Sequence, residues 1–301
     1  MTRKFLRRWL KLVPHRLLPH VLALTTIVIS SVATIAAVGW LLPRPSEPAP
    51  AVLSSKFNFQ PSPPEISAAH SFILDLDSDL VLFSKSADMP VAPASTTKLL
   101  TALVARANLP LSQDITIDQA FPNGQDIGLT PGERLTVEQL IYALLIQSGN
   151  DAAEVLAENF PGGRPAFIQA MNQTAADLRL YNSTFKNPTG LDENGHVSTA
   201  SDLARLGQAV LKDPFLARIV ASETALITAS DSARVLTNTN QLLGRVPGVL
   251  GIKTGYTDAA GEALITLVDR QDRRILFVVL KSLDRFGDTE KLINWAYPEN
   301  P

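Results

Sequence analysis

The chain has 301 residues, of which 46% are hydrophobic and 19% are charged, and this composition excludes disorder throughout its length. Six Arg and Lys residues, with no acidic residue, fall within the first twenty positions, so the remainder is acidic and no nucleic-acid-binding surface is expected. The absence of cysteine excludes disulfide bonds, thiolate nucleophiles and Cys-ligated zinc. The four histidines lack the spacing of a metal site, so no metal is expected.

The N-terminal region has the pattern of a membrane anchor. Residues 21–42 contain no charged side chain, and 22 helical residues span about 33 Å, enough to cross a bilayer core. The basic residues before this run predict a cytoplasmic leader at 1–20. We therefore expect a single-pass cell-membrane protein whose folded domain is extracytoplasmic. The alternative is a cleaved signal peptide, for which Ala37-Val38-Gly39 is a weak processing site.

A proline-rich linker is predicted at residues 43–66. It contains seven prolines and few large apolar residues, a composition that favours extended polyproline II and builds no core. We interpret this segment as a tether between the anchor and a folded domain at 67–301.

The folded domain alternates between strand-like and helix-like patterns. Residues 72–76 and 80–83 flank a polar turn, as expected for a β-hairpin. Periodicity and capping predict helices at 96–107, 136–147 (with Thr136 as N-cap), 151–159, 166–180, 201–211 and 289–296, and strands at 249–254, 262–268 and 275–281. Strands at both ends of the domain predict an α+β fold in which the first and last strands pair in one antiparallel sheet.

Ser95 and Lys98 carry the first chemical signal. They lie three positions apart at the start of a predicted helix and therefore share one face. A serine hydroxyl is a weak nucleophile, and a lysine amine kept neutral by burial or by a nearby cation can remove its proton. Taken alone, the pair is better explained by a helix-capping serine and a solvated lysine.

Two further motifs follow in the chain. Ser148-Gly149-Asn150 lies where one predicted helix ends and another begins, so helix capping by Asn150 would explain it. Lys253-Thr254-Gly255 continues an apolar strand, and an edge strand protected by its lysine would explain it. The three motifs in this order are much less expected by chance than any one of them, and together they are the signature of penicillin-binding proteins and related β-lactamases.

On these motifs the chain resembles the low-molecular-mass D-alanyl-D-alanine carboxypeptidases of the serine penicillin-recognising superfamily. The blocks 93–99, 145–152, 187–192 and 251–257 also look like blocks of that family. The resemblance implies a DD-peptidase/β-lactamase-like domain over 67–301, with an antiparallel sheet and a helical cluster. It also implies a serine-type hydrolase that needs no cofactor and no metal.

The resemblance also implies a role for each motif residue. Ser95 would be the acylated nucleophile and Lys98 its general base. Ser148 would relay a proton to the leaving amine, and Asn150 would bind the substrate's amide. Lys253 and Thr254 would hold the substrate's terminal carboxylate beside Gly255, and the backbone N–H groups of Ser95 and Tyr256 would form the oxyanion hole.

The implied substrates are peptidoglycan stem peptides ending in D-Ala-D-Ala, with β-lactams as acylating inhibitors. Cleavage of cross-links by an endopeptidase remains open, as does a catalytically silent wall-binding protein. A class A β-lactamase is disfavoured because no glutamate is followed four positions later by asparagine at the expected place. Tyr256 replaces the histidine common in the family. Asp192 and His196 also match a block of the family without an evident chemical role, and His196 is expected to brace a loop.

Overall fold

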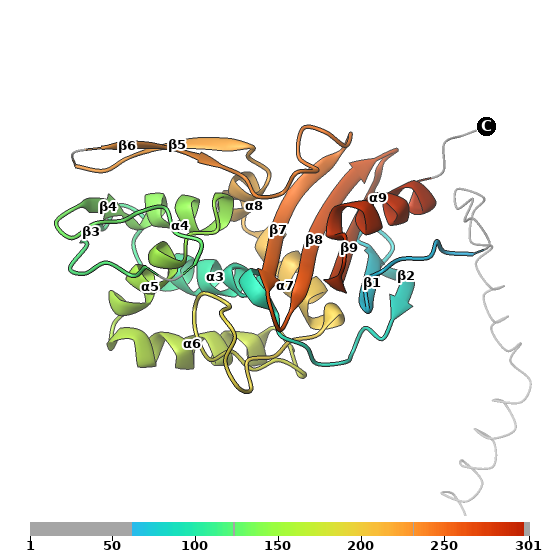
Figure 1. Ribbon diagram of the computed structural model, residues 1–301, viewed down its shortest axis with the longest axis horizontal. Coiled ribbons are helices and arrows are strands. Elements are labelled where there is room, and N and C mark those ends of the chain that lie inside the picture. The colour runs from blue at the N-terminus through green and yellow to red at the C-terminus, as the bar shows by residue number, and fades with distance from the viewer. Residues whose placement is uncertain (1–61, 123, 231, 298–301) are drawn as a thin grey trace, which may run out of the picture. The chain divides into compact units, whose positions relative to one another are not determined.

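The computed structural model describes residues 62–122, 124–230 and 232–297, which fall within the compact unit Phe59–Pro301. Among these residues no helix has both the length and the hydrophobicity that a membrane span requires. The leader predicted at 1–20, the anchor at 21–42 and most of the linker at 43–66 lie outside the described residues. The described residues form a β-sheet and a helical cluster that lie side by side (Figure 1).

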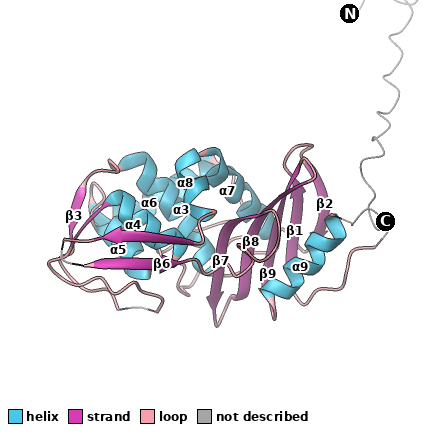
Figure 2. Ribbon diagram, turned by 90° about the horizontal axis from the view of Figure 1, so that it is seen from above, coloured by secondary structure: helices cyan, strands magenta, loops and turns pink. Residues whose placement is uncertain are grey.

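A five-stranded antiparallel sheet has the order β2-β1-β9-β8-β7. Its strands are β1 His70–Asp75, β2 Leu80–Lys85, β7 Val249–Thr257, β8 Gly261–Arg270 and β9 Arg273–Ser282. β1 pairs with β2 and with β9, which confirms the predicted hairpin and the predicted pairing of the first and last strands. β7 is the edge strand nearest the helices (Figure 2).

Most helices are close to their predicted positions. The helices are η1 Ala94–Thr97 (3₁₀), α3 Lys98–Asn108, α4 Val137–Ile146, α5 Asn150–Glu158, α6 Gly163–Asp177, α7 Ala200–Lys212, α8 Pro214–Val220 and α9 Arg285–Ala296. Among them, α9 starts four residues earlier than expected and α8 was not expected. Thr136 caps α4 as predicted, in a reciprocal capping box with Gln139. The helix predicted at 96–107 is divided, because a 3₁₀ turn precedes α3 and places Ser95 before the first α-helical residue.

The core forms on both faces of the sheet because successive strand residues point to opposite sides. In β9, Phe277 and Val279 pack in one cluster with Leu292 of α9, while Val278 and Leu280 belong to the larger cluster formed with the other helices. The continuous apolar run of β9 therefore reflects a strand that is covered on both faces.

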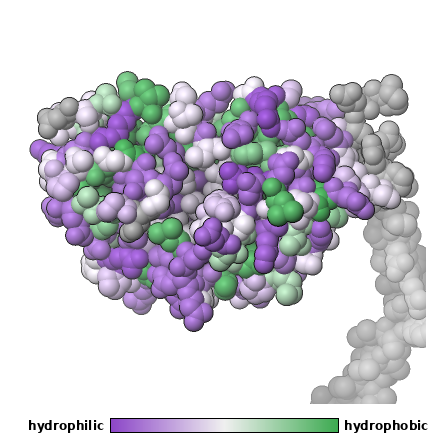
Figure 3. All heavy atoms as spheres, in the orientation of Figure 1, coloured by the Kyte–Doolittle hydropathy of each residue, from purple (hydrophilic) through white to green (hydrophobic). Residues whose placement is uncertain are grey.

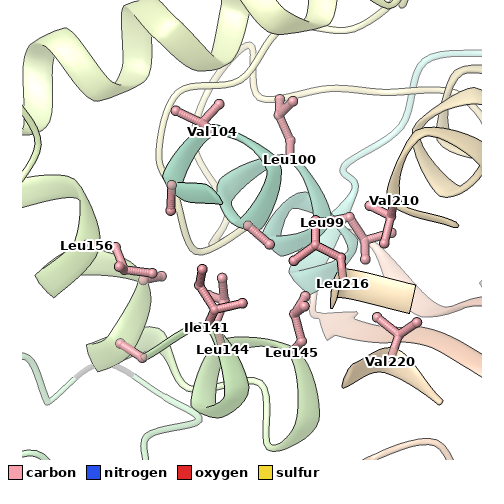
Figure 4. Packing of buried hydrophobic residues seen from close by; sticks show 14 of the residues in the cluster. Leu99, Leu100, Val104, Ile141, Leu144, Leu145, Leu156, Val210, Leu216 and Val220 are labelled. Atoms are coloured by element: carbon pink, nitrogen blue, oxygen red, sulfur yellow. The ribbon is translucent and has the colours of Figure 1, made fainter. Parts of the chain in front are cut away.

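The helical cluster converges on α3. Leu99 of α3, Leu145 of α4 and Leu216 of α8 are all buried and lie close together in Figure 4. Because Leu99 follows Lys98 directly, this packing also fixes the backbone position of Lys98.

One helix and two strand pairs were not predicted from the sequence. They are α8 and two small antiparallel pairs, β3 Asp114–Thr116 with β4 Arg134–Thr136 and β5 Thr224–Thr228 with β6 Ala233–Thr237. α8 has only seven residues and starts one residue after α7, with Asp213 capping it and Pro214 as its first residue.

Candidate active site

A cleft of about 330 Å³ lies between the helical cluster and β7. Its lining is Ser95, Gly124, Gln125, Ser148, Asn150, Gly190, Leu191, Thr239, Thr254, Gly255, Tyr256, Thr257 and Arg285. All three motifs therefore reach one cleft, although more than a hundred residues separate the first from the last. The face of the molecule drawn in Figure 3 is mostly hydrophilic, with apolar side chains in small scattered groups.

Lys98 lies buried directly behind Ser95. Its Nζ is 2.8 Å from Ser95 Oγ, 2.6 Å from Asn150 Oδ1 and 2.7 Å from the carbonyl oxygen of Thr189. The side chain has no exposed surface. The pKa of Lys98 lies well below its usual value. Burial is the larger cause, and the positive charge of Lys253 lowers the pKa further.

Three oxygen atoms surround the Lys98 amine, and its lowered pKa favours the neutral form. Asn150 Oδ1 and the Thr189 carbonyl can only accept hydrogen bonds, so they take the two N–H groups of a neutral –NH₂. The remaining lone pair then faces Ser95, whose hydroxyl can donate. This arrangement suits removal of the serine proton.

Ser148 and Asn150 lie at the junction of α4 and α5. Ser148 has a φ of 65°, in the left-handed region, and is buried at the cleft wall. Asn150 is the first residue of α5, and its side-chain oxygen reaches Lys98. The motif therefore contributes to both the cleft and the lysine's surroundings.

The segment around Gln125 is held to the same junction. The Asn150 backbone N–H donates to the Gln125 carbonyl at 2.7 Å. The carboxylate of Asp151 accepts from the backbone N–H groups of Ile127 and Leu129. These bonds keep Gln125 at the cleft, a position that no local sequence pattern indicated.

Lys253 lies behind the cleft wall. Its side chain is buried and is absent from the lining, whereas Thr254, Gly255 and Tyr256 belong to it. Lys253 Nζ donates to the carbonyl of Thr254 at 3.2 Å. The pKa of Lys253 is lowered to about 7, mainly by burial and to a smaller extent by the positive charge of Arg285.

β7 and the loop that contains Gly190 pack closely against the turn at Ala94 and Ser95. A Cβ added to Gly255 would lie 3.1 Å from the Ser95 nitrogen, and one added to Gly190 would lie only 1.9 Å from the Ala94 oxygen. Asn187 Oδ1 accepts from the Gly190 N–H and the Thr189 hydroxyl. This network orients the loop that presents the Thr189 carbonyl to Lys98.

Asp192 and His196 join the same loop to its neighbours. Asp192 accepts hydrogen bonds from the Thr257 hydroxyl and the Ala259 N–H, so it ties the loop to the end of β7. His196 Nε2 lies 3.0 Å from Thr97 Oγ1, and burial lowers the pKa of this imidazole to about 4. The contact of His196 agrees with the bracing expected for that residue, and Asp192 braces the same loop without having been expected to.

Arg285 is a cleft residue that the motif analysis missed. It is the first residue of α9, and its guanidinium donates to the Gly255 carbonyl at 3.1 Å. It lines the cleft beside Thr254. No sequence signal pointed to it, because a single arginine that precedes the helix predicted at 289–296 resembles an ordinary surface residue.

Comparison with known proteins places this site in a family. The family model for D-alanyl-D-alanine carboxypeptidase matches residues 57–283. The chain belongs to this family. That membership confirms the family inferred from the motifs and, with it, the expected class of enzyme, a serine-type D-alanyl-D-alanine carboxypeptidase.

Individual relatives are similar to this chain in sequence or structure over most of its length. D-alanyl-D-alanine carboxypeptidase DacF of Bacillus subtilis is 33% identical over 77% of this chain, and the match spans 62% of DacF. DacB2 of Mycobacterium tuberculosis is 34% identical over 79% of this chain and 85% of its own length. The crystal structure of the Streptomyces K15 DD-transpeptidase superposes with a TM-score of 0.75 at 29% identity, covering 78% of this chain and 98% of that one. The α+β DD-peptidase fold is thereby confirmed.

Proposed function

We propose that the protein removes the terminal D-alanine from peptidoglycan stem peptides through an acyl-enzyme on Ser95. The observation that carries the proposal is the short contact between Ser95 Oγ and the buried amine of Lys98, whose other neighbours are acceptors. Family membership indicates the bond that is cleaved. The cleft geometry supports a role for each residue around it.

Acylation begins with proton transfer. Lys98 takes the proton of the Ser95 hydroxyl as the oxygen attacks the carbonyl carbon of the penultimate D-alanine. Backbone N–H groups of Ser95 and Tyr256 stabilise the oxyanion, a contribution of about 3 kcal/mol per donor in comparable enzymes. The C–N bond then breaks, Ser148 relays a proton to the leaving amine, and Asn150 holds the peptide amide. Water finally hydrolyses the ester and restores Ser95.

The terminal carboxylate of the substrate is bound at the β7 wall. Thr254 and Arg285 supply hydrogen-bond donors there, and the buried Lys253 adds positive charge from behind. A bond between a charged group and a carboxylate contributes about 1.5–3 kcal/mol in a cleft. β-Lactams carry a comparable carboxylate beside a reactive amide, so they acylate the same serine.

The domain acts outside the cytoplasm and is tethered to the membrane by residues 21–42. The uncharged run, its basic flank and the proline-rich segment support this part of the proposal. Digestion of intact cells or spheroplasts with an external protease should release an active soluble fragment that starts near residue 60. A mature protein that begins near Gly39 would instead show a cleaved signal peptide.

The decisive experiment uses a defined muropeptide. Incubation with a pentapeptide ending in D-Ala-D-Ala, followed by mass analysis, should show loss of one alanine. Release of monomers from a cross-linked dimer at a higher rate would assign endopeptidase activity. Penicillin labelling without turnover of either substrate would indicate a silent binding protein.

The variant Ser95→Ala tests the nucleophile by penicillin labelling. This variant should lose covalent penicillin label and peptide turnover, with rates falling by about 10⁴-fold or more. Ser84→Ala, on the exposed side of β2, should behave as wild type. Equal labelling of Ser95→Ala and wild type would exclude Ser95 as the nucleophile.

A further inference from the structure

Two threonine hydroxyls meet at the β7 wall of the cleft. Thr239 Oγ1 and Thr254 Oγ1 are 2.6 Å apart, and both residues line the cleft. Thr254 belongs to the Lys-Thr-Gly motif, whereas Thr239 lies in the segment between β6 and β7 and belongs to no motif. At this distance one hydroxyl donates a hydrogen bond to the other, so each constrains the orientation of the other.

Thr239 is held by a rigid support. Its backbone N–H donates to the carbonyl of Ile146 at the end of α4. On its other side, Asn240 donates from its side chain to Gly251 of β7 and from its backbone to Asn238 Oδ1. The segment thus bridges the helical cluster and β7, so the Thr239 hydroxyl has a defined position.

A carboxylate bound at Thr254 would set the direction of the bond. Each threonine hydroxyl has one proton to donate, and a carboxylate can only accept. If Thr254 donated to Thr239, only its lone pairs would face the cleft, and they would repel a carboxylate. If Thr239 donates instead, the proton of Thr254 is available to the cleft.

We propose that Thr239 is a positioning residue for substrate recognition. It donates its proton to Thr254 and so leaves the Thr254 hydroxyl to donate to the terminal carboxylate of the substrate. The inference rests on the proposed function, because it requires a substrate with a free carboxylate at this wall. The bond that Thr254 accepts also polarises its own O–H group and strengthens the bond that it donates.

The test is a set of four variants measured against two peptides. Thr239→Val removes the hydroxyl with little change of shape, and Thr239→Ser restores a hydroxyl. Thr254→Val and the double variant Thr239→Val/Thr254→Val complete a thermodynamic cycle. Each variant is assayed for kcat and KM with a peptide ending in D-Ala-D-Ala and with the same peptide amidated at its C-terminus.

We expect Thr239→Val to lower kcat/KM for the free-acid peptide by about fivefold to tenfold, with a much smaller loss for the amide. Thr239→Ser should recover most of that loss. The double variant should be no worse than Thr254→Val, because Thr239 acts through Thr254. Additive losses in the double variant, equal losses on the two peptides, or failure of serine to rescue would each overturn the inference.

A second readout separates this inference from the proposed function. Acylation of Ser95 by benzylpenicillin and by its methyl ester is measured in the same variants. Thr239→Val should slow acylation by the free acid and leave the ester rate nearly unchanged. A wild type that is acylated but cleaves no D-Ala-D-Ala peptide would overturn the proposed function, while the penicillin comparison would still decide the role of Thr239.

Discussion

The helical side and the sheet side of the cleft each supply a buried lysine, but their surroundings differ. Lys98, at the start of α3, has three oxygen atoms within 2.8 Å of its Nζ. Lys253, in β7, donates to one carbonyl at 3.2 Å. Burial lowers the pKa of both, so burial alone does not distinguish their tasks. The partners do, because the two acceptors beside a neutral Lys98 would leave its lone pair facing Ser95, whereas Lys253 would act through its charge.

The largest effect is expected on the helical side. Lys98→Ala should slow acylation of Ser95 by penicillin by about 10²-fold or more, because the variant lacks the proposed base for the serine proton. Stopped-flow or gel-based labelling measures this rate. Lys212→Ala, at the exposed end of α7, is the matched control. Near-normal acylation of Lys98→Ala would assign the base elsewhere and remove the contrast between the two lysines.

A smaller effect, of about tenfold, is expected from Lys253→Ala on turnover of a free-acid peptide, with much less loss on the amidated peptide. The pH profile sharpens the comparison further. The charge of Lys253 lowers the pKa of Lys98, so its removal should raise that pKa. Since only neutral Lys98 acts as a base, the acidic limb of acylation by penicillin methyl ester should move to higher pH.

The ester is chosen because it has no carboxylate, so loss of anion binding cannot imitate the shift in pH. In the wild type, Lys253 itself loses its charge as the pH rises through its pKa of about 7. An acidic limb that stays in place in Lys253→Ala would show that the sheet-side lysine has no influence on Lys98.

Gly190→Ala tests the loop that joins the two sides. The glycine has a φ of +87°, and an added Cβ would lie 1.9 Å from the Ala94 oxygen, so the Ala94-Ser95 backbone would have to move. Gly195→Ala is the matched control, because φ there is +78° but the nearest atom is the end of a lysine side chain at 3.4 Å. We expect Gly190→Ala to lose about 2 kcal/mol more stability in urea than the control, and to acylate more slowly. Equal losses would mean that backbone strain alone matters at Gly190.

The smallest effect is expected at Asp288, on the sheet side and outside the cleft lining. Burial would raise the pKa of Asp288, but hydrogen bonds from Ser67, Ser282 and Ala68 outweigh it and lower the pKa below the usual 3.8. This carboxylate therefore stabilises the fold above that pH, and the contribution is lost as the pH falls through the lowered pKa. Asp288→Asn should cost about 1–2 kcal/mol in urea unfolding at neutral pH, with penicillin acylation unchanged. A variant as stable as wild type would show that the carboxylate adds nothing beyond an amide.

Much of the fold followed from local patterns. The β1–β2 hairpin, the Thr136 cap and the long apolar strands β8 and β9 were predicted because the signals lie within one element. The hairpin β5–β6 was missed because Leu226 and Val235 are exposed while Ile227 and Leu236 are buried, so an apolar-polar alternation is absent.

The resemblance to a family brought the three distant motifs into one site, but the residues alone predicted a contact only where they are close in sequence. Ser95 and Lys98 lie one helical turn apart, so their contact could be expected. The Thr189 carbonyl, Thr239 and Arg285 reach the same cleft from distant segments, and a backbone carbonyl or a single threonine leaves no pattern to recognise. The position of Lys253 behind Thr254 likewise depends on how β7 meets the helical cluster.

The hydrogen bonds between Ser67 and Asp288 have a mechanical consequence. Both the backbone N–H and the hydroxyl of Ser67 donate to Asp288 of α9, and β1 follows three residues later between two antiparallel partners. A pulling force applied to the chain before Ser67 would run along β1 and load the hydrogen bonds on both sides of it in shear, so that many must yield together. The domain would thus resist tension applied to the chain before Ser67, at the opposite edge of the sheet from β7 and the cleft.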